Sequence, residues 1–224
     1  MKTNIEKFNT FSLRVRKAAK TKIEILKAFL ELLQSSSLDT MKVEDICRRV
    51  EISHKTFFNY FEKKELLLSY FIQLHSYEMG YISSLYLKQT KKPLFAIREI
   101  FKQTALGLKN QPQIMLELIC LQTSTEVPCS FEVSEAEKLY FFQDIPNIEL
   151  YEDGGLDYLI PSLLQEAKDL KQLKNESDIE FIYLEIMSSF YGSSILALRR
   201  DPKQYAEILD KMIENTLAVY ILDK

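Results

Sequence analysis

The chain has 224 residues, which is enough for one large domain or two small ones with a buried core. Apolar residues make up 46% and charged residues 27%, as in an ordinary soluble globular protein. No apolar run approaches the roughly 18 to 20 residues that cross a membrane, and none follows the positive N-terminal residues as in a secretory signal. Three widely spaced cysteines without a CxxC motif argue against a zinc site or a disulfide framework. We therefore expect a cytoplasmic protein with no membrane partner, no metal and no cofactor.

The net charge of −3 hides an asymmetry along the chain. Residues 1–64 hold 14 Lys and Arg against 8 Asp and Glu, whereas residues 65–224 hold 15 against 24. A basic front on an acidic body suggests a polyanion as the partner of the front. The alternative is chance clustering of charges on a solvated surface.

The N-terminal residues are polar and basic. We expect residues 1–18 to form a flexible arm, which either lies along DNA phosphates or is a solvated tail. The first firm helix is predicted from about residue 20 to residue 34, because Ile23, Leu26, Leu30 and Leu33 recur at helical spacing.

Two short amphipathic segments follow, with only a few residues between them. Thr40 is a plausible N-cap for a helix over 41–50, and Ser53 is a good N-cap for a helix that reaches Asn59 or Tyr60. The second segment turns Ile52, Phe57 and Phe61 inward. Its outward residues all carry hydrogen-bonding groups, as a surface facing DNA bases and phosphates requires: His54, Lys55, Thr56, Asn59 and Tyr60. Residues 19–64 are thus predicted to be a helix-turn-helix domain.

The rest of the chain, residues 65–224, predicts further helices separated by prolines, glycines and capping residues. Ser134 and Ser177 each precede a glutamate by three residues, which is the pattern of a capping box. No strand pattern competes with these helices. We expect an all-α fold of about nine helices.

Residues 25–68 resemble the DNA-binding domain of the tetracycline-repressor (TetR) family. The matching positions lie in all the predicted helices of this region: Ala28, Leu30, Glu31, Leu32, Val43, Asp45, Ile46, Arg49, Ser53, Thr56, Phe57, Asn59, Tyr60, Phe61, Lys64, Glu65 and Leu67. The resemblance implies a recognition helix that carries Ser53, Thr56, Asn59 and Tyr60, with Lys64 near a phosphate. It also implies a helical body that binds an effector.

Several positions depart from the family pattern. Glu51 replaces the usual turn glycine, so the turn should carry left-handed strain of roughly 1 kcal/mol or adopt another shape. Lys55 replaces a small residue and would either add a phosphate contact or block close approach. Phe58 lacks the hydroxyl of the family's first tyrosine. The usual Thr-Thr pair is Met41 and Lys42, so that capping shifts to Thr40 and charge replaces a hydroxyl contact.

The body is rich in aromatic residues, which either pack as core or line a pocket for an apolar or aromatic effector. Tyrosine hydroxyls could orient such a ligand. The candidates for the pocket are Phe101, Met115, Tyr140, Tyr158 and Tyr183.

The last two helices have unusual faces. One carries a surface of small residues, and the other is apolar around more than half its circumference, which indicates either two partners or a helix buried deep in a monomer. With a second subunit, the two helices would form an isologous four-helix interface. The candidate interface residues are Phe190, Ser194, Ala197, Leu209, Met212 and Thr216.

An enzyme has no positive sign in the sequence. The only histidines, His54 and His75, are 21 residues apart in different predicted helices, and no Gly-rich phosphate loop, GxSxG or HExxH motif occurs. We therefore expect a homodimeric repressor that a small effector releases from a palindromic operator. The alternative is a non-enzymatic helical protein whose basic front binds a protein or membrane.

Overall fold

The computed structural model describes residues 2–108, 111–123, 132–151 and 155–222. Within these ranges the regular structure is helical, apart from an isolated β-bridge between Leu173 and Ile221. The prediction of an all-α fold is confirmed. The described residues form two compact units: unit 1 contains 2–78, 117–123 and 132–151, and unit 2 contains 79–108, 111–116 and 155–222.

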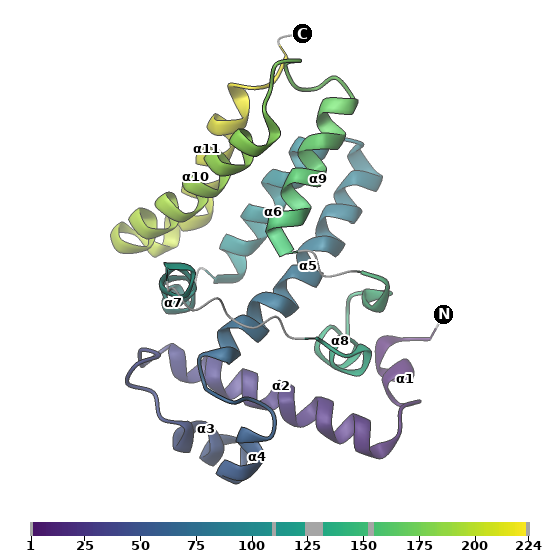
Figure 1. The fold of residues 1–224 in the computed structure, drawn as a ribbon, viewed down its shortest axis with the longest axis vertical. Coiled ribbons are helices and arrows are strands. Elements are labelled where there is room, and N and C mark those ends of the chain that lie inside the picture. Colours follow the sequence, from purple (N-terminus) through teal and green to yellow (C-terminus); the bar gives the residue numbers. More distant parts are fainter. Residues whose placement is uncertain (1, 109–110, 124–131, 152–154, 223–224) are drawn as a thin grey trace. The chain divides into compact units, whose positions relative to one another are not determined.

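Unit 1 is built around one long helix, α2, which packs against the short helix α3 and against α8 (Figure 1). Its core includes the fully buried side chains of Phe29, Phe57, Phe61 and Tyr70. The elements of this unit are α1 (Asn4–Phe8), α2 (Leu13–Leu33), α3 (Val43–Val50), α4 (His54–Phe58), the first part of α5 (Leu66–Thr90), the last part of α7 (Pro112–Thr123), α8 (Glu135–Phe141) and the 3-10 turn η1 (Ile148–Leu150).

The N-terminal residues fold as helix, so the prediction of a flexible arm over 1–18 is wrong for residues 2–18. Helix α1 is closed by a capping box between Thr3 and Glu6, and Phe8 is fully buried, with its ring 5.1 Å from that of Tyr140. Ser12 then caps α2, which begins seven residues before the predicted start at about residue 20. The first turns of α2 are rich in basic residues, so their apolar periodicity was too weak to predict them as helix.

The compact units also differ from the predicted division after residue 64. Residues 132–151 follow α7 in the chain, yet they belong to unit 1 with the helix-turn-helix. The buried side chains of Val133, Ala136 and Leu139 explain this, because they give α8 an apolar side that packs against α1 and α2.

Unit 2 is a stack of long helices in which α11 packs against both α10 and α6, and α9 packs against α6 and α10 (Figure 1). Arg98 on α6 bridges to Asp210 and Glu214 on α11 at 3.2 and 2.9 Å. Besides parts of α5 and α7, the elements are α6 (Pro93–Leu108), α9 (Gly155–Asp169), α10 (Ile179–Arg200), the 3-10 turn η2 (Pro202–Gln204) and α11 (Tyr205–Ala218).

Two predicted caps take a different form. Asp178, rather than Ser177, caps α10 by accepting hydrogen bonds from two backbone N–H groups. Ser134 caps α8 as expected, but the Glu137 carboxylate of the expected capping box lies with Lys22 and Tyr70 instead. Sequence spacing located both helix starts and missed these competing partners.

Helix α10 is long and apolar enough, by length and composition alone, to cross a membrane, with a mean hydropathy of 1.4. The core helix of a soluble protein meets the same criterion. One side of α10 lies in the core of unit 2, where Ile182, Ile186 and Phe190 are buried. Its opposite side is also apolar and is exposed, with Phe181 and Leu184 about half accessible.

Candidate nucleic-acid interface

The turn between α3 and α4 is formed by a residue in the left-handed conformation. Glu51 has φ 57° and ψ 43°, so the strained turn anticipated from the sequence is present. The Cys47 carbonyl accepts hydrogen bonds from the N–H groups of both Glu51 and Ile52, which closes the end of α3. A non-glycine residue in this region costs roughly 1–2 kcal/mol, so the surrounding contacts must hold the turn in place.

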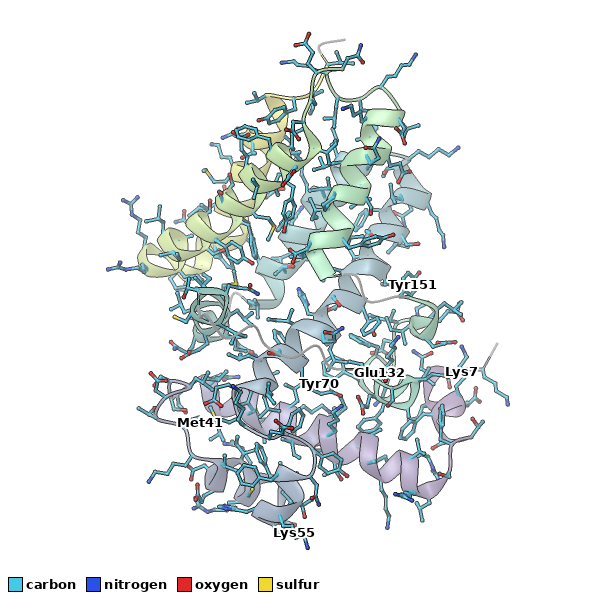
Figure 2. The ribbon with its side chains drawn as sticks, viewed as in Figure 1. Lys7, Met41, Lys55, Tyr70, Glu132 and Tyr151 are labelled. Carbon is cyan, nitrogen blue, oxygen red and sulfur yellow. The ribbon has the colours of Figure 1, made fainter. Side chains whose placement is uncertain are left out.

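Helix α4 is short and is anchored at one point. The Ser53 hydroxyl accepts a hydrogen bond from the Thr56 N–H at 3.1 Å, and the two hydroxyls are 2.9 Å apart. Phe57 is fully buried, and its ring lies 6.1 Å from that of Phe61. This anchor leaves Lys55 and Asn59 exposed, and Figure 2 shows Lys55 pointing away from the helices of unit 1.

The other predicted DNA-contacting residues are accessible to different degrees. Most are exposed, whereas Thr56, Tyr60 and Lys64 are half-buried. The hydroxyl of Thr40 lies 3.0 Å from that of Ser37 rather than capping α3, whose N-cap is Lys42 without a side-chain hydrogen bond. The capping role predicted for Thr40 is therefore wrong, and its contact with DNA stays a prediction.

Lys64 supports the loop before α3. Its ammonium group donates to the carbonyl of Met41 at 2.6 Å and lies 3.4 Å from that of Asp39. The Glu117 carboxylate accepts a hydrogen bond from the Leu38 N–H of the same loop at 3.0 Å. Lys64 was expected near a phosphate, but these contacts engage its ammonium in holding the loop that carries Thr40 and Lys42.

Phe58 is an apolar side chain on the exposed surface of α4. The ring is 50% exposed and packs edge-on against Phe57 and His54, with ring centroids 5.3 and 6.4 Å away. The Nε2 atom of His54 lies 3.8 Å from the Glu44 carboxylate on α3. An exposed phenylalanine among polar side chains can contact a thymine methyl group in the major groove.

Ion pairs neutralise part of the basic front. Arg48 pairs with Asp45 at 3.1 Å, and Arg49 pairs with Glu31 on α2 at 3.0 Å. Lys42 and Lys55, in contrast, have no acidic partner within ion-pair distance among the described residues. These two ammonium groups therefore remain available to a polyanion.

The candidate effector residues are distributed over both units. Phe101 is buried in unit 2, 5.0 Å from the ring of Phe190, and Met115 is also buried. Tyr158 is largely exposed, and the Tyr183 hydroxyl donates to Asp157. Burial, together with Asp157, raises the pKa of Tyr183 above its usual range.

Tyr140 does not belong with the other candidate effector residues. It lies on α8 in unit 1, where its ring packs against Phe8 and its hydroxyl is 3.3 Å from Glu24. Burial, then the Glu24 carboxylate, raises its pKa. The helix of Tyr140 was assigned to the body because of its place in the sequence, and its side chain is instead part of the packing around α2.

Most of the candidate dimer residues are in the core of the protomer. Phe190, Ser194, Ala197 and Leu209 are buried, and the Ser194 hydroxyl lies 2.9 Å from that of Tyr205. Assigning these four to a dimer interface was wrong, because the small side chains of α10 allow the close approach of α11 from the same chain.

A groove marks the outer side of the same helix pair. Met212 is 42% exposed, and the Thr216 hydroxyl is 2.8 Å from that of Ser189 across the two helices. The groove measures about 530 Å³ and is lined by Phe181, Leu184, Glu185, Ser188, Ser189, Met212, Asn215, Thr216 and Val219. Two candidate interface residues, Met212 and Thr216, are thus on an accessible surface.

Metal-binding and redox groups are sparse in the parts of the chain that the structure describes. No group of three or more His, Cys, Asp or Glu side chains there could hold a metal ion. Cys47 is buried and Cys120 is exposed, both as free thiols, and Cys129 lies outside the described residues. Burial, then the Glu44 charge, raises the pKa of Cys47, which suits a packing residue.

We compared the chain with known protein families and with proteins of known function. No family model matches the chain. A stretch of 65 residues, 29% of the chain, is 37% identical to the HTH-type dhaKLM operon transcriptional activator DhaS of Lactococcus lactis, and this match spans 35% of that relative's length.

Solved structures match over most of the chain at low sequence identity. FadR of Thermus thermophilus, a TetR-family transcriptional repressor in complex with lauroyl-CoA, aligns with a TM-score of 0.63 and 19% identity over 91% of this chain and 96% of that one. SmeT, the repressor of the multidrug efflux pump SmeDEF of Stenotrophomonas maltophilia, aligns with a TM-score of 0.61 and 17% identity over 90% and 91%. The chain therefore has the fold of the TetR-family transcriptional regulators.

Proposed function

We propose that the chain is a DNA-binding transcriptional regulator that acts as a homodimer. The observation that carries this proposal is α4, a capped and anchored helix that leaves Lys55, Phe58 and Asn59 exposed after a tight turn. Such a helix can enter the major groove, where Asn59 would hydrogen-bond with a base edge and Lys55 would contact a base or a phosphate. Lys42, at the N-terminus of α3, would contact the DNA phosphate backbone.

The groove on α10 and α11 supports the proposed homodimer. Large apolar side chains on this surface are accessible, with Phe181 54%, Leu184 53% and Val219 61% exposed. A contiguous apolar surface of this kind usually marks a binding site for another protein. In an isologous dimer the same two helices of each protomer would cover each other, and the two recognition helices would meet DNA about 34–36 Å apart.

We further propose that the protein is a cytoplasmic repressor. In this proposal a small apolar effector binds in unit 2 and lowers the affinity of the protein for DNA. The packed rings of Phe101 and Phe190 are an apolar environment, and an apolar ligand would bind there by separating the two rings. FadR of T. thermophilus was solved with lauroyl-CoA, which makes a long-chain acyl compound a reasonable first probe. An effector shifts DNA binding only through different affinities for the two conformations.

Fluorescence anisotropy with duplexes from the DNA upstream of the chain's own gene tests the proposal. We expect saturable binding by the dimer, with affinity that falls linearly with salt concentration on a double-logarithmic scale. Lauroyl-CoA added to the preformed complex tests the effector class separately. Failure of the folded dimer to bind any upstream or palindromic duplex at low salt would contradict the proposed function.

A further inference from the structure

The segment 133–151, which contains α8 and η1, packs with α1 and α2 in the unit that holds the helix-turn-helix, rather than with its neighbours in the chain. It follows α7 and precedes α9, whereas its packing partners in unit 1 are α1 and α2. Helix α2 in turn packs on α3, and the Arg49 ion pair with Glu31 joins those two helices. The orientation of α2 therefore affects the helix-turn-helix directly.

Glu137 is the polar centre of this packing. Its side chain is buried, with 8% of the residue exposed, and both carboxylate oxygens lie near the Lys22 ammonium, at 3.2 and 3.3 Å. The Tyr70 hydroxyl of α5 donates to the same carboxylate at 2.9 Å. The Lys22 ammonium also lies 4.4 Å from the centre of the Tyr70 ring. Three helices thus meet at one carboxylate, and Figure 2 shows Tyr70 among the helices of unit 1.

The Tyr70 hydroxyl of this cluster keeps its proton across the physiological range. Burial, followed by the Glu137 charge, raises the pKa of Tyr70 far above its usual range, so the hydroxyl remains a donor. A buried ion pair contributes little net stability compared with apolar side chains of similar size, but in several proteins it fixes one geometry among several packings. Positioning is therefore a suitable role for the cluster.

Other contacts tie the segment to α2 and to α1. The Asn4 side-chain amide donates to the carbonyls of Phe142 and Ile145 at 2.5 and 2.6 Å. The ammonium groups of Lys20 and Lys27 each lie 5.6 Å from the centre of the Tyr140 ring. These contacts support α8, whereas the Glu137 carboxylate joins α2 to α5 by accepting from both Lys22 and Tyr70.

We infer that Glu137 is a positioning residue for DNA recognition, which holds α2 and α5 at the angle that presents α4 to the major groove. This inference rests on the proposed function. Glu137 lies more than 70 positions beyond the helix-turn-helix, and it helps to set DNA affinity without any contact with DNA.

The test compares Glu137→Gln with Glu135→Gln in the full-length dimer. Both substitutions remove one negative charge from α8, but Glu135 is exposed, so it gives the purely electrostatic effect on DNA binding. We expect Glu137→Gln to bind the duplex roughly tenfold more weakly than Glu135→Gln, within the range found for residues that act through packed contacts. Equal affinities of the two variants would overturn the inference.

Stability is measured in parallel, because a lone buried Lys22 can unfold the protein. Binding is compared only at temperatures far below the Tm of each variant, where a purely stabilising role would leave affinity unchanged. If Glu137→Gln does not fold, the double variant Lys22→Met/Glu137→Leu replaces it, since exchanging both charges for apolar side chains removes the unpaired charge. The same roughly tenfold loss is expected there.

Hydrogen exchange separates failure of the inference from failure of the proposed function. If the wild-type dimer binds no duplex, the proposed function fails, and amide exchange of α3 and α4 then decides the role of Glu137. We expect these amides to exchange several-fold faster in the folded Glu137 variant than in Glu135→Gln, with α9 to α11 unchanged. Identical exchange in α3 and α4 would overturn the positioning role.

Discussion

The outer surface of α4 and the outer surface of the α10–α11 pair are both accessible, and they differ in chemistry. The first presents Lys55 and Asn59 around one aromatic ring, and the second presents large apolar side chains such as Leu184 and Val219. Charged and amide groups suit a polyanion with readable base edges, whereas an apolar groove suits a surface that excludes water. Exposure alone therefore identifies two surfaces, and the difference in side-chain chemistry is the reason that we propose DNA for one and a second subunit for the other.

The largest expected effect comes from placing a charge on the apolar surface. We expect Leu184→Glu to raise the dimer dissociation constant about a hundredfold or more, because a carboxylate would be buried in an apolar interface. Sedimentation velocity measures this change. Leu170→Glu is the matched control, since Leu170 is an exposed leucine of unit 2 outside the groove. A Leu184→Glu protein that dimerises like the control would contradict the assignment of the groove.

The reading surface is tested by Asn59→Ala and Lys55→Ala. Loss of a base contact should weaken DNA binding by about 1–3 kcal/mol, and loss of a phosphate contact should lower the salt slope by about one. Anisotropy titrations at several salt concentrations distinguish the two roles. Lys211→Ala, at an exposed lysine on α11, controls for net charge. If Asn59→Ala and Lys55→Ala both bind DNA like the Lys211→Ala control, α4 is not the reading helix.

The turn between the two helices gives a smaller effect that should leave both surfaces intact. Glu51→Gly relieves the left-handed strain and adds unfolded-state entropy, so we expect a net gain in unfolding free energy of about 0.5–1 kcal/mol. Urea denaturation measures the gain. DNA affinity should not change, because Glu51 lies in the turn. A destabilised variant would show that the Glu51 side chain makes a favourable contact that outweighs the strain.

The smallest expected effect is a pH dependence within unit 1. Burial tends to raise the pKa of Glu149, but Lys7 and Lys138 outweigh it and hold this pKa below the ordinary value of 4.5. The stability contributed by the carboxylate is therefore present above pH 4.5 and is lost as the pH falls through the lowered folded value. Glu149→Gln should lower the Tm at pH 7, and this Tm difference should shrink as the pH falls below 4.5. A Tm difference that stays constant as the pH falls would contradict the role of this ion pair.

Local patterns predicted the helix-turn-helix well. Ser53, Phe57 and Phe61 lie within nine residues, and together they specify a cap, an anchor and the outward positions of α4. The left-handed turn was anticipated as one of two shapes from the family resemblance, which places a glycine where this chain has Glu51. The all-α class and most helix starts follow from similarly short-range capping and periodicity.

Contacts between distant segments could not be predicted in the same way. Lys22 and Glu137 are separated by 115 positions, and nothing in their local patterns relates them. Periodicity indicates that a helix face is buried but not which helix covers it. The small residues Ser194 and Ala197 were therefore assigned to a partner, whereas α11 of the same chain covers them. The same limit led to the misplacement of Tyr140.

The most direct test of the central claim is a hydroxyl-radical footprint of the full-length dimer on its own upstream DNA. We predict two protected half-sites of a palindrome, with centres about one helical turn, or a multiple of it, apart. Asn59→Ala should reduce protection of both half-sites together. A folded dimer that protects no sequence, or that protects DNA uniformly without a repeated half-site, would contradict the account of α4 as a sequence-reading helix in a symmetric dimer.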